Sequence, residues 1–490
     1  MKLSNATLRD LPSHIVTPTY DRSALKAGIV HIGCGNFHRA HMAVYLDDLF
    51  GMGLDHDWAI IGAGVRAPDG KMRDVLAAQD YLSTVSELNP DRSETRVIGS
   101  MIDFIPVEQT NGPLIAAMTD PAIRIVSLTV TEGGYFIDPK TNTFSPSHPA
   151  IQADAAHPDA PETAFGAIIA ALKARRAAGT PAFTVMCCDN VPHNGHVTRD
   201  AVTGLCRLFD AELADWIAAN VAFPNSMVDR ITPATGPRER QMVADMGIDD
   251  AAPVTSESFR QWVLEDNFPN GRPALEKVGV TFTDAVDAYE TMKIRILNGG
   301  HAILAYPGGL RDIHFVHEAM QDPQIRAFLD KVETTEILPI VPPVPQTDLL
   351  EYKELILERC SNPEVADTVR RLCLDGSNRQ PKFIVPSIRD VVAKGNDATG
   401  LILLSALWCR YCFGTSEKGV VIEPNDPNWD VLTAVSAKAK TDPSAWLAMH
   451  EVYGDLGENA VVSARFDQIL RAVWADGSEA VIARYLDGTL

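Results

Sequence analysis

Gly28-Ile-Val-His-Ile-Gly33-Cys-Gly35-Asn-Phe-His38-Arg-Ala-His41 is an apolar, β-branched run that passes through two glycines into a segment with apolar residues at helical spacing. Strand, glycine turn and helix form the arrangement in which a pyrophosphate binds at a helix N-terminus, because glycines permit a tight turn and close backbone approach. The match to G-x-G-x-x-G is partial, since His38 stands at the third glycine position. We therefore predict a dinucleotide-binding βα unit, with a plain βα turn as the alternative.

Three later apolar runs, residues 58–64, 122–131 and 182–188, end in polar or glycine-rich loops, and residues 164–176 carry apolar side chains at helical period. Repeated strand, loop and helix units predict a mostly parallel sheet. Ligands of such sheets bind outside the carboxyl ends of the strands. Asn190 lies at one of these ends, although an asparagine in a turn, taken alone, is more often there for backbone reasons.

An acidic residue beyond the second strand bears on the choice of dinucleotide. Asp69 is placed to hold the adenosine ribose hydroxyls and to repel a 2′-phosphate, which favours NAD. Arg66 favours NADP, and the distance from Gly33 to Asp69 exceeds the usual spacing of about 20 residues. We expect NAD as the cofactor, with NADP as the less favoured alternative.

From residue 286 onward the pattern changes to amphipathic helical segments, which are 286–305, 323–338, 347–360, 363–373, 400–413 and 456–474. Pro339-Ile-Val-Pro-Pro-Val-Pro345 predicts an extended surface loop between them. The predicted fold class is α/β, with a Rossmann-like dinucleotide-binding N-terminal domain, residues 1–285, and a mostly α-helical C-terminal domain, residues 286–490. We expect the substrate in a cleft between these domains.

A second stretch places ionisable and amide side chains among apolar residues: Tyr289-Glu-Thr-Met-Lys293-Ile-Arg-Ile-Leu-Asn298-Gly-Gly-His301. In an α-helix, at about 100° per residue, Glu290, Lys293, Asn298 and His301 share one arc. Burial lowers the pKa of a lysine toward neutrality, so this arc predicts a proton-transfer site. The alternative is a solvated helix face.

Gly299 and Gly300 weaken that helix by about 1 kcal/mol each relative to alanine. A bend or an end of the helix at this pair would move His301 off the arc. Close approach of the backbone to a cofactor or substrate would explain why glycines stand here.

The composition argues against several partners. A formal net charge of −21 and a pI near 5.0 disfavour nucleic acid and anionic membranes, since both need a basic surface. No stretch reaches the roughly 18 apolar residues that span a bilayer, and the N-terminus has no apolar signal segment. The eight cysteines lack the spacing of a disulfide framework. We expect a cytoplasmic protein with reduced thiols and an acidic surface compatible with a monomer.

Metal chemistry has no support in the sequence. No zinc-protease motif, paired C-x-x-C or Walker-type loop is present. The pairs His38 with His41 and His193 with His196 have ligand spacing but lack a third ligand. Local hydrogen bonding or core packing is the preferred interpretation of both pairs, and we expect no metal.

Two other motifs resemble known active-site patterns. Cys409 and Cys412 form C-x-x-C inside a run typical of a buried helix, so core packing is preferred over redox work. Tyr289-x-x-x-Lys293 matches the catalytic dyad of short-chain dehydrogenases. The chain lacks the glycine turn of that group, so we do not assign the tyrosine a catalytic role.

Five pieces of the sequence carry a broader resemblance: Gly33-Cys-Gly-Asn-Phe-His-Arg-Ala-His41, Thr131-Glu-Gly-Gly-Tyr135, Asp189-Asn190 with His193-Asn194-Gly195, Met227-Val-Asp-Arg-Ile-Thr-Pro233, and Lys293-Ile-Arg-Ile-Leu-Asn298-x-x-His301. Together and in this order they resemble the polyol-specific long-chain dehydrogenase/reductase family. They span most of residues 28–301, and several ordered pieces are more specific than any single motif.

The resemblance implies a metal-independent NAD(P) enzyme that interconverts a sugar alcohol and its ketose, with mannitol and fructose as the expected pair. It implies that Lys293 is the general acid/base and that Asn190 and Asn298 form an oxyanion hole. His301 would position the substrate, and Glu290 would belong to a proton relay to solvent.

The resemblance also implies ligand contacts. Cofactor contacts are expected from Gly33, Gly35, Asn36, Phe37, Arg39, Asp69 and Glu132, and substrate contacts from Asp229, Arg379 and Lys382. Because basic side chains also bind carboxylates, a sugar-acid (fructuronate) reductase is an alternative, and arabinitol or sorbitol oxidation is another. A catalytically inactive nucleotide-sensing protein is the alternative from a different class; the complete set of implied catalytic residues argues against it.

Overall fold

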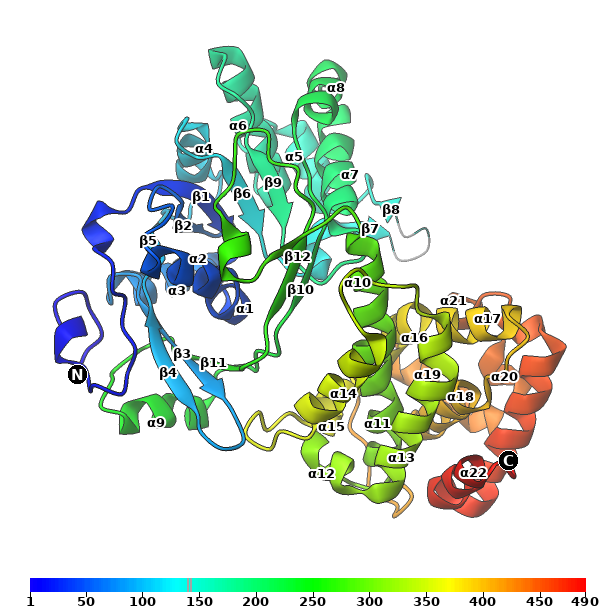
Figure 1. The fold of residues 1–490 in the computed structure, drawn as a ribbon. Helices are drawn as coiled ribbons and strands as arrows, with labels where there is room; N and C mark the ends of the chain where they lie inside the picture. Colours follow the sequence, from blue (N-terminus) through cyan, green and yellow to red (C-terminus); the bar gives the residue numbers. More distant parts are fainter. Residues whose placement is uncertain (139–140, 142) are drawn as a thin grey trace. The chain divides into compact units, whose positions relative to one another are not determined.

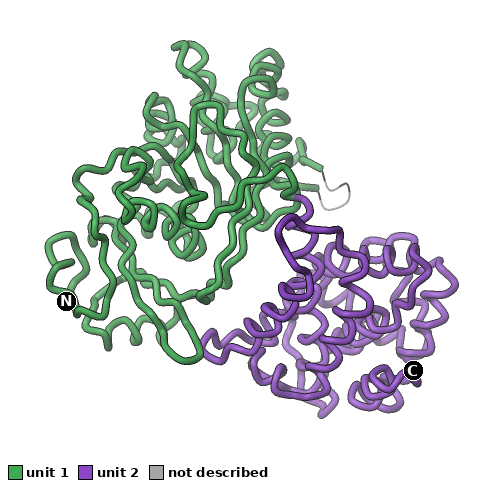
Figure 2. The backbone as a smooth tube through the Cα atoms, viewed as in Figure 1, with its two compact units in different colours: residues 1–286 green, residues 287–490 purple. Residues whose placement is uncertain are grey.

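The computed structural model describes residues 1–138, 141 and 143–490. The chain divides into two compact units, Met1–Val286 and Asp287–Leu490 (Figure 2). Each unit has its own type of architecture, α/β in the first and helical in the second, as the sequence predicts.

The first unit is built on a five-stranded parallel sheet of order β5-β2-β1-β6-β9 (Figure 1). The strands are β1 (Ala27–Ile32), β2 (Ala59–Ala63), β5 (Met101–Phe104), β6 (Ile125–Leu128) and β9 (Thr184–Cys187). The four strands expected from apolar runs are confirmed, each within the predicted range or one residue beyond it. The edge strand β5 was not foreseen.

Both faces of this sheet are buried, because alternate side chains of each strand enter different cores. Val30 packs in one core and Ile29 in the other. The core around Val30 includes residues of α4 (Gly112–Thr119), α5 (Pro149–Ala156), α6 (Ala164–Ala178), α7 (Asn194–Arg207) and α8 (Ala211–Asn220). The core around Ile29 includes α1 (Asn36–Ala40) and α2 (Met42–Gly51). Burial on both faces explains why the strands read as continuous apolar runs.

Smaller elements complete the first unit. Two three-stranded sheets contain β3 (Ser83–Leu88), β4 (Glu94–Ile98) and β11 (Val254–Glu257), and β10 (Ser226–Asp229), β12 (Gln261–Leu264) and β13 (Thr281–Phe282). The remaining elements are the strands β7 (Ile137–Asp138) and β8 (Thr143–Phe144) and the helices α3 (Ala67–Ala77) and α9 (Pro237–Asp245). Leu3, Leu11 and Ile15 of the N-terminal segment pack in a third, smaller core, so this segment packs onto the rest of the first unit.

The second unit is mainly helical. Its main helices are α10 (Val286–Met292, which begins on the last residue of the first unit), α11 (Gly299–Leu310), α12 (Val316–Gln321), α13 (Pro323–Val332), α14 (Leu349–Cys360), α15 (Val369–Leu372), α16 (Gly376–Phe383), α17 (Val385–Ala393), α18 (Thr399–Tyr411), α19 (Trp429–Ala439), α20 (Ser444–Leu447), α21 (His450–Tyr453) and α22 (Ala460–Asp487). All residues of α18 are buried, and it packs against α11 and α22. Cys409 and Cys412 lie buried with the other six cysteines, and none of the eight forms a disulfide, which supports the core-packing interpretation.

Some predicted helix limits are wrong. The segment 363–373 is helical only in α15, because Thr368 caps that helix and pairs as a β-bridge with Phe315. The long C-terminal helix α22 continues well past residue 474 and is kinked at Gly477, whose φ is +83°. The proline segment begins as a short 3₁₀ helix, Leu338–Ile340, and buries Val341 and Val344, so it is only partly an exposed loop. None of the helices in the described part of the chain has the length and apolar character needed to cross a bilayer.

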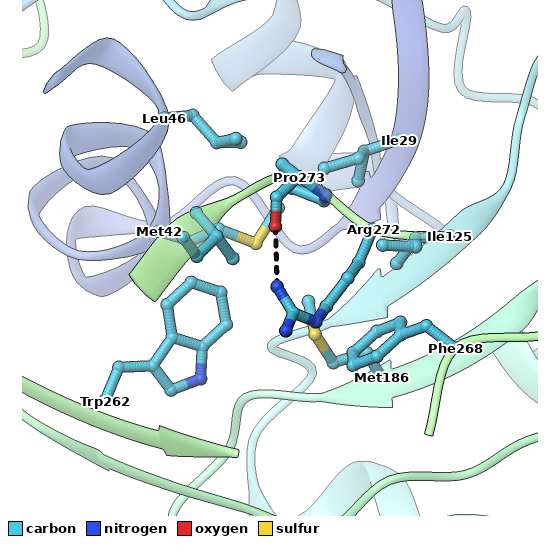
Figure 3. A pocket seen from close by; sticks show the side chains of 10 residues that line it. Ile29, Met42, Leu46, Ile125, Met186, Trp262, Phe268, Arg272 and Pro273 are labelled. Carbon is cyan, nitrogen blue, oxygen red and sulfur yellow. Dashed lines mark hydrogen bonds between the residues drawn. The ribbon is translucent and has the colours of Figure 1, made fainter. Parts of the chain in front are cut away.

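A small cavity lies beside the parallel sheet, between β1, α2 and β12 (Figure 3). Its walls are apolar, formed by Ile29, Met42, Met186 and Trp262, and the Arg272 guanidinium donates to the carbonyl of Pro273 at 3.2 Å beside it. The cavity encloses about 10 Å³, which is room for one water molecule at most. It is therefore a packing defect and cannot hold a nucleotide or a sugar.

Buried Arg175 of α6 ties together the segments before β6 and β9. Its guanidinium donates to four backbone carbonyls, those of Met118 (2.7 Å), Asp120, Ile123 (2.6 Å) and Pro181 (2.7 Å). Burial lowers its pKa to about 10, so it stays charged at neutral pH. These bonds connect the segments that lead into the neighbouring strands β6 and β9 with the helix layer.

Arg175→Met should lower the free energy of unfolding by about 3 kcal/mol, because buried carbonyls lose their donors. Arg176→Met is the matched control: its exposed side chain pairs with Glu212 and lies over the Trp216 ring, both at the surface, so the expected change is below about 1 kcal/mol. Urea unfolding followed by tryptophan fluorescence measures both. Equal costs for the two substitutions would contradict this role of Arg175.

Candidate functional site

The two glycines of the turn after β1 differ in whether the fold itself requires a glycine. Gly33 has φ of +104°, and a Cβ there would overlap the carbonyl oxygen of Thr129, so the fold itself requires glycine. Gly35 has ordinary extended geometry, and a Cβ there would meet nothing within 4 Å. The space beside Gly35 is therefore open to a group from outside the protein.

The residues after the turn are held mainly by the protein. Asn36 donates through Nδ2 to the Pro233 carbonyl (3.2 Å) and to Thr235 Oγ1 (3.0 Å). Arg39 is buried and donates to the Ala252 carbonyl and to Asn36 Oδ1 (2.9 Å). Burial lowers the pKa of Arg39 to about 10. Arg39 thus orients Asn36 from inside the protein.

The histidines of the turn are core residues. His38 stacks on His31 with ring centroids 3.5 Å apart, and both are buried. Burial lowers the pKa of His38 well below its usual value, so the stack is neutral. His41 lies next to the carbonyl of Gln261 through Nε2 at 3.0 Å and stacks on Phe37. At position 38, where the nucleotide motif has its third glycine, an imidazole therefore packs in the core, as the core-packing interpretation predicts.

Three predicted site residues follow strands at one edge of the sheet. Glu132 comes after β6 and Asn190 after β9, and both are exposed. Asp69 lies in the first turn of α3, beyond β2, where its Oδ2 accepts from the backbone N–H groups of Val65 (3.1 Å) and Arg66 (2.9 Å). Because these strands are parallel, the three residues gather at the carboxyl edge, where ligands of such sheets bind.

Asp69 and Arg66 oppose each other in the choice of nucleotide, and the structure pairs them. The Arg66 Nη2 lies 3.3 Å from Asp69 Oδ1, with the arginine side chain exposed. Asp69 is fixed as the cap of α3, whereas Arg66 is held by one exposed ion pair of little strength. The fixed charge at this position is therefore negative.

Asp229 ends β10 as a buried residue. The next residue, Arg230, is also buried and donates to Glu87 Oε1 (2.5 Å) and to the carbonyl of Glu257 (3.0 Å). Charged side chains are rarely buried without partners. Arg230 therefore has the partners that its burial requires.

In the second unit, Lys293 begins a π-helical segment, Lys293–Asn298, between α10 and α11. The backbone stays helical on both sides, since Met292 and Gly299 have ordinary right-handed angles. The helix therefore does not end at the glycine pair, a point that the sequence left open, but the uninterrupted α-helical geometry assumed for the arc is wrong. A π-helical turn bonds i to i+5 and is wider than an α turn, so the assumed 100° per residue fails between Lys293 and Asn298. Such turns occur frequently at functional sites.

The predicted catalytic side chains of this run differ in exposure. Lys293 is 7% exposed, and Glu290, Asn298 and His301 are half-buried. Tyr289 is buried and donates its hydroxyl to the carbonyl of Pro345 at 2.5 Å, which supports a structural role for it.

Helix α16, with Arg379 and Lys382, contacts the π-helical segment. Lys382 is exposed, whereas Arg379 is half-buried and donates to the carbonyls of Arg371 (3.4 Å) and Leu372 (3.2 Å). The helical unit therefore brings both predicted substrate-binding cations onto an element that touches the segment of Lys293.

A buried carboxyl that the sequence reasoning missed packs against the same helical run. Glu333 is fully buried, and a Cβ on Gly300 would lie 2.5 Å from its Oε1. Neither carboxyl oxygen has a hydrogen-bond partner among the described residues. Nearby Lys353 supplies none, because its ammonium is bonded to Asp330, Thr334 and Glu354.

Burial raises the pKa of Glu333 well above its usual value, which favours the neutral acid over the carboxylate. Glu333 opens a second π-helical segment, Glu333–Ile337, which contacts the first. Gly300 is therefore explained by Glu333, not by a ligand. The sequence signal was available, since Glu333 lies four residues after buried Leu329 and continues its apolar stripe.

The chain matches known proteins along both units. Residues 27–277 match the family described as "Mannitol dehydrogenase Rossmann domain", and residues 285–474 match "Mannitol dehydrogenase C-terminal domain". The "Mannitol 2-dehydrogenase" of Cereibacter sphaeroides is 65% identical over 472 residues, 96% of this chain and 99% of that protein.

Two solved structures are similar over nearly the whole chain. The mannitol 2-dehydrogenase of Pseudomonas fluorescens, in ternary complex with NAD and D-mannitol, has a TM-score of 0.90 at 46% identity, covering 99% of this chain and 100% of that one. A D-sorbitol dehydrogenase in substrate-free form has a TM-score of 0.89 at 34% identity, covering 98% of this chain and 100% of that one.

The parallel sheet with its glycine turn and the helical second unit, with the two domain matches, define an oxidoreductase with a Rossmann domain. The chain belongs to the mannitol dehydrogenase family.

Gly300→Ala should destabilise the protein by about 1 to 3 kcal/mol, because its Cβ is forced against the Glu333 carboxyl. In a Glu333→Ala background the same substitution should cost nothing or stabilise by up to about 1 kcal/mol through helix propensity. Gly299→Ala is the matched control, since its Cβ meets its nearest neighbours at 3.7 Å. Urea unfolding of the double-mutant cycle measures the coupling. Equal effects at Gly299 and Gly300, or no coupling to Glu333, would refute the contact.

Proposed function

We propose that the protein oxidises D-mannitol to D-fructose with NAD and catalyses the reverse reduction. The observation that carries the proposal is Lys293, a nearly buried lysine that begins a π-helical turn with amide and imidazole side chains close by in the chain. The 65% identical relative bears the name of this activity, and a structural relative binds NAD and D-mannitol. Both domain matches extend over the segments that hold the proposed site residues.

The first unit fits a dinucleotide. Open space at Gly35 allows a pyrophosphate to approach the backbone, and the tight turn at Gly33 directs the chain there. The fixed carboxylate of Asp69 would accept from the ribose hydroxyls and repel a 2′-phosphate, which favours NAD. Asn36, Phe37 and Glu132 flank this place. NAD, when bound, accepts the hydride from the carbinol carbon.

Lys293 is the proposed general base. In the oxidative direction its neutral amine takes the proton of the hydroxyl group on the reacting carbon. In ketose reduction its ammonium gives that proton back to the developing alkoxide. Glu290 lies three residues earlier, one turn of α10 away, and is half-buried, so we assign it the relay that exchanges this proton with solvent.

Asn190 and Asn298 are the proposed amide donors to the alkoxide. Each such donor contributes about 3 to 4 kcal/mol to the transition state without adding charge. His301 would hydrogen-bond a substrate hydroxyl. We assign Asp229, Arg379 and Lys382 to further hydroxyl groups of the polyol. Both carbonyl bonds of Arg379 come from Nη1, so its other N–H groups are the ones assigned to the substrate.

Lys293→Ala should lower turnover by about 10³-fold and leave the Kd for NADH within about twofold, because the base acts on the substrate alone. Added methylamine should restore part of the lost rate. Lys394→Ala, which removes an exposed lysine of the same unit, serves as the control and should turn over like wild type. Unchanged turnover in Lys293→Ala would refute the lysine mechanism.

Gly35→Ala should fold like wild type but weaken NADH binding by about tenfold, equivalent to about 1.4 kcal/mol. Gly33→Ala should instead lose stability, because its φ is unfavourable for alanine and its Cβ overlaps Thr129. NADH fluorescence titration and urea unfolding separate the two effects. Wild-type NADH affinity in Gly35→Ala would show that no pyrophosphate approaches there.

Substrate identity is tested directly by NADH absorbance with mannitol, sorbitol, arabinitol, fructose and fructuronate. The proposal predicts the highest kcat/KM for the mannitol and fructose pair. A preference for fructuronate would assign Arg379 and Lys382 to a carboxylate and make the protein a sugar-acid reductase. NADH binding without hydride transfer to any of the five would favour a nucleotide sensor.

A further inference from the structure

One carboxylate joins the loops that follow β6 and β9. Asp189 Oδ2 accepts from the backbone N–H of Val130 (2.8 Å) and from the hydroxyl of Tyr135 (2.6 Å), and its Oδ1 accepts from the N–H of Thr131 (3.1 Å). Three donors of the β6 loop therefore converge on the residue directly before Asn190. Burial raises the pKa of Asp189, and the bonds from Tyr135, Val130 and Thr131 oppose that rise.

The β6 loop carries backbone strain at the point where Asp189 holds it. Thr131 has φ of +67° and ψ of 163°, a conformation that residues other than glycine rarely adopt. Such a residue costs about 1 to 3 kcal/mol and persists only where its surroundings impose it. Its N–H bond to Asp189 is one such constraint. The strain is therefore stored in a loop whose conformation depends on the position of Asp189.

The main chain of Asp189 is fixed from the other side. Asn194 is buried, and its Nδ2 donates to the Asp189 carbonyl (3.1 Å) and to the Ser226 carbonyl (2.8 Å). Its Oδ1 accepts from the N–H of Ser226 (2.8 Å). The side chain and the carbonyl of Asp189 are both held by hydrogen bonds. The next residue, the exposed Asn190, therefore follows a rigidly held backbone.

Tyr135 contributes both its ring and its hydroxyl group to this rigid arrangement. It is fully buried, and the ring packs in the core beside Phe165, with centroids 5.7 Å apart. Core packing needs only the ring. The hydroxyl lies between Asp189 Oδ2 and Cys187 Sγ, at 2.6 Å and 2.8 Å, and thus links the end of β9 to the β6 loop.

We infer that Asp189 and Tyr135 are positioning residues that hold Asn190 where its amide meets the developing alkoxide. The inference rests on the proposed function, because it takes the role of Asn190 from there. It explains why Thr131-Glu-Gly-Gly-Tyr135 and Asp189-Asn190, although distant in sequence, form one hydrogen-bonded unit that positions Asn190.

The test compares Tyr135→Phe, Asn190→Ala and the double variant in the full-length protein. Tyr135→Phe keeps the ring and removes only the hydroxyl. It should lower kcat for mannitol oxidation by about 10- to 100-fold, as a misplacement of about 1 Å does. KM and the Kd for NADH should stay within about threefold. In the Asn190→Ala background it should lower kcat no further, since the two residues act as one unit.

Tyr453→Phe is the matched control, because it removes another buried hydroxyl, bonded to Trp446 Nε1 at 2.9 Å, from the second unit. It should lower the urea midpoint without changing kcat.

The outcomes distinguish the positioning role of Asp189 and Tyr135 from the oxyanion role of Asn190. If Asn190→Ala lowers kcat but Tyr135→Phe does not, or if Tyr135→Phe lowers kcat equally in both backgrounds, the positioning inference is overturned and the proposed function stands. If Asn190→Ala leaves kcat unchanged, the oxyanion role fails and the inference fails with it.

Discussion

The buried carboxyl of Glu333 lies against the backbone of Gly300 without a hydrogen-bond partner among the described residues. A carboxylate there would cost far more free energy than the neutral acid, so burial raises the pKa of Glu333 and favours the protonated form. Its bulk requires a glycine in the helix that carries Lys293, and its own segment is the second π-helical turn of the unit. Two irregular turns therefore meet at the element on which the proposed chemistry depends.

In the first unit, the side chain that supports the proposed site is the carboxyl group of Asp189, which accepts hydrogen bonds through both of its oxygens. Asp189 accepts from Val130, Thr131 and Tyr135, and its hydrogen bonds hold a strained residue in place. The side chains proposed to touch ligands are thus supported by buried residues that do not touch them. Such support fixes geometry before the ligand arrives, which lowers the cost of organising a transition state.

Patterns with a fixed period were predictable from the sequence. The β-branched runs around Val30, Val126 and Val185 form strands of the parallel sheet, which buries both of their faces. The start of α18 was also predicted within one residue, since its apolar run is uninterrupted. The edge strand β5 was missed because it has only four residues and its apolar run is interrupted by exposed Asp103.

Features that depend on tertiary contacts were not predictable. The π-helical turn at Lys293 changes the helical period locally, and a calculation at 100° per residue assumes that no such change occurs. Glu333 continues the apolar stripe through Leu329, but its close contact with Gly300 depends on the packing of another helix and has no signal in the sequence. The glycine turn illustrates both cases: Gly33 was expected from the motif, whereas stacking of His38 on His31 depends on the packed strand.

The central claim is that a lysine amine transfers the proton in both directions of a hydride-transfer reaction. The pH dependence of kcat/KM for mannitol oxidation and fructose reduction in the wild-type protein tests it most directly. Oxidation needs the neutral base and should fall as pH decreases, whereas reduction needs the protonated acid and should fall as pH increases, with one shared apparent pKa. Profiles that fall in the same direction, or that do not depend on pH, would contradict the account.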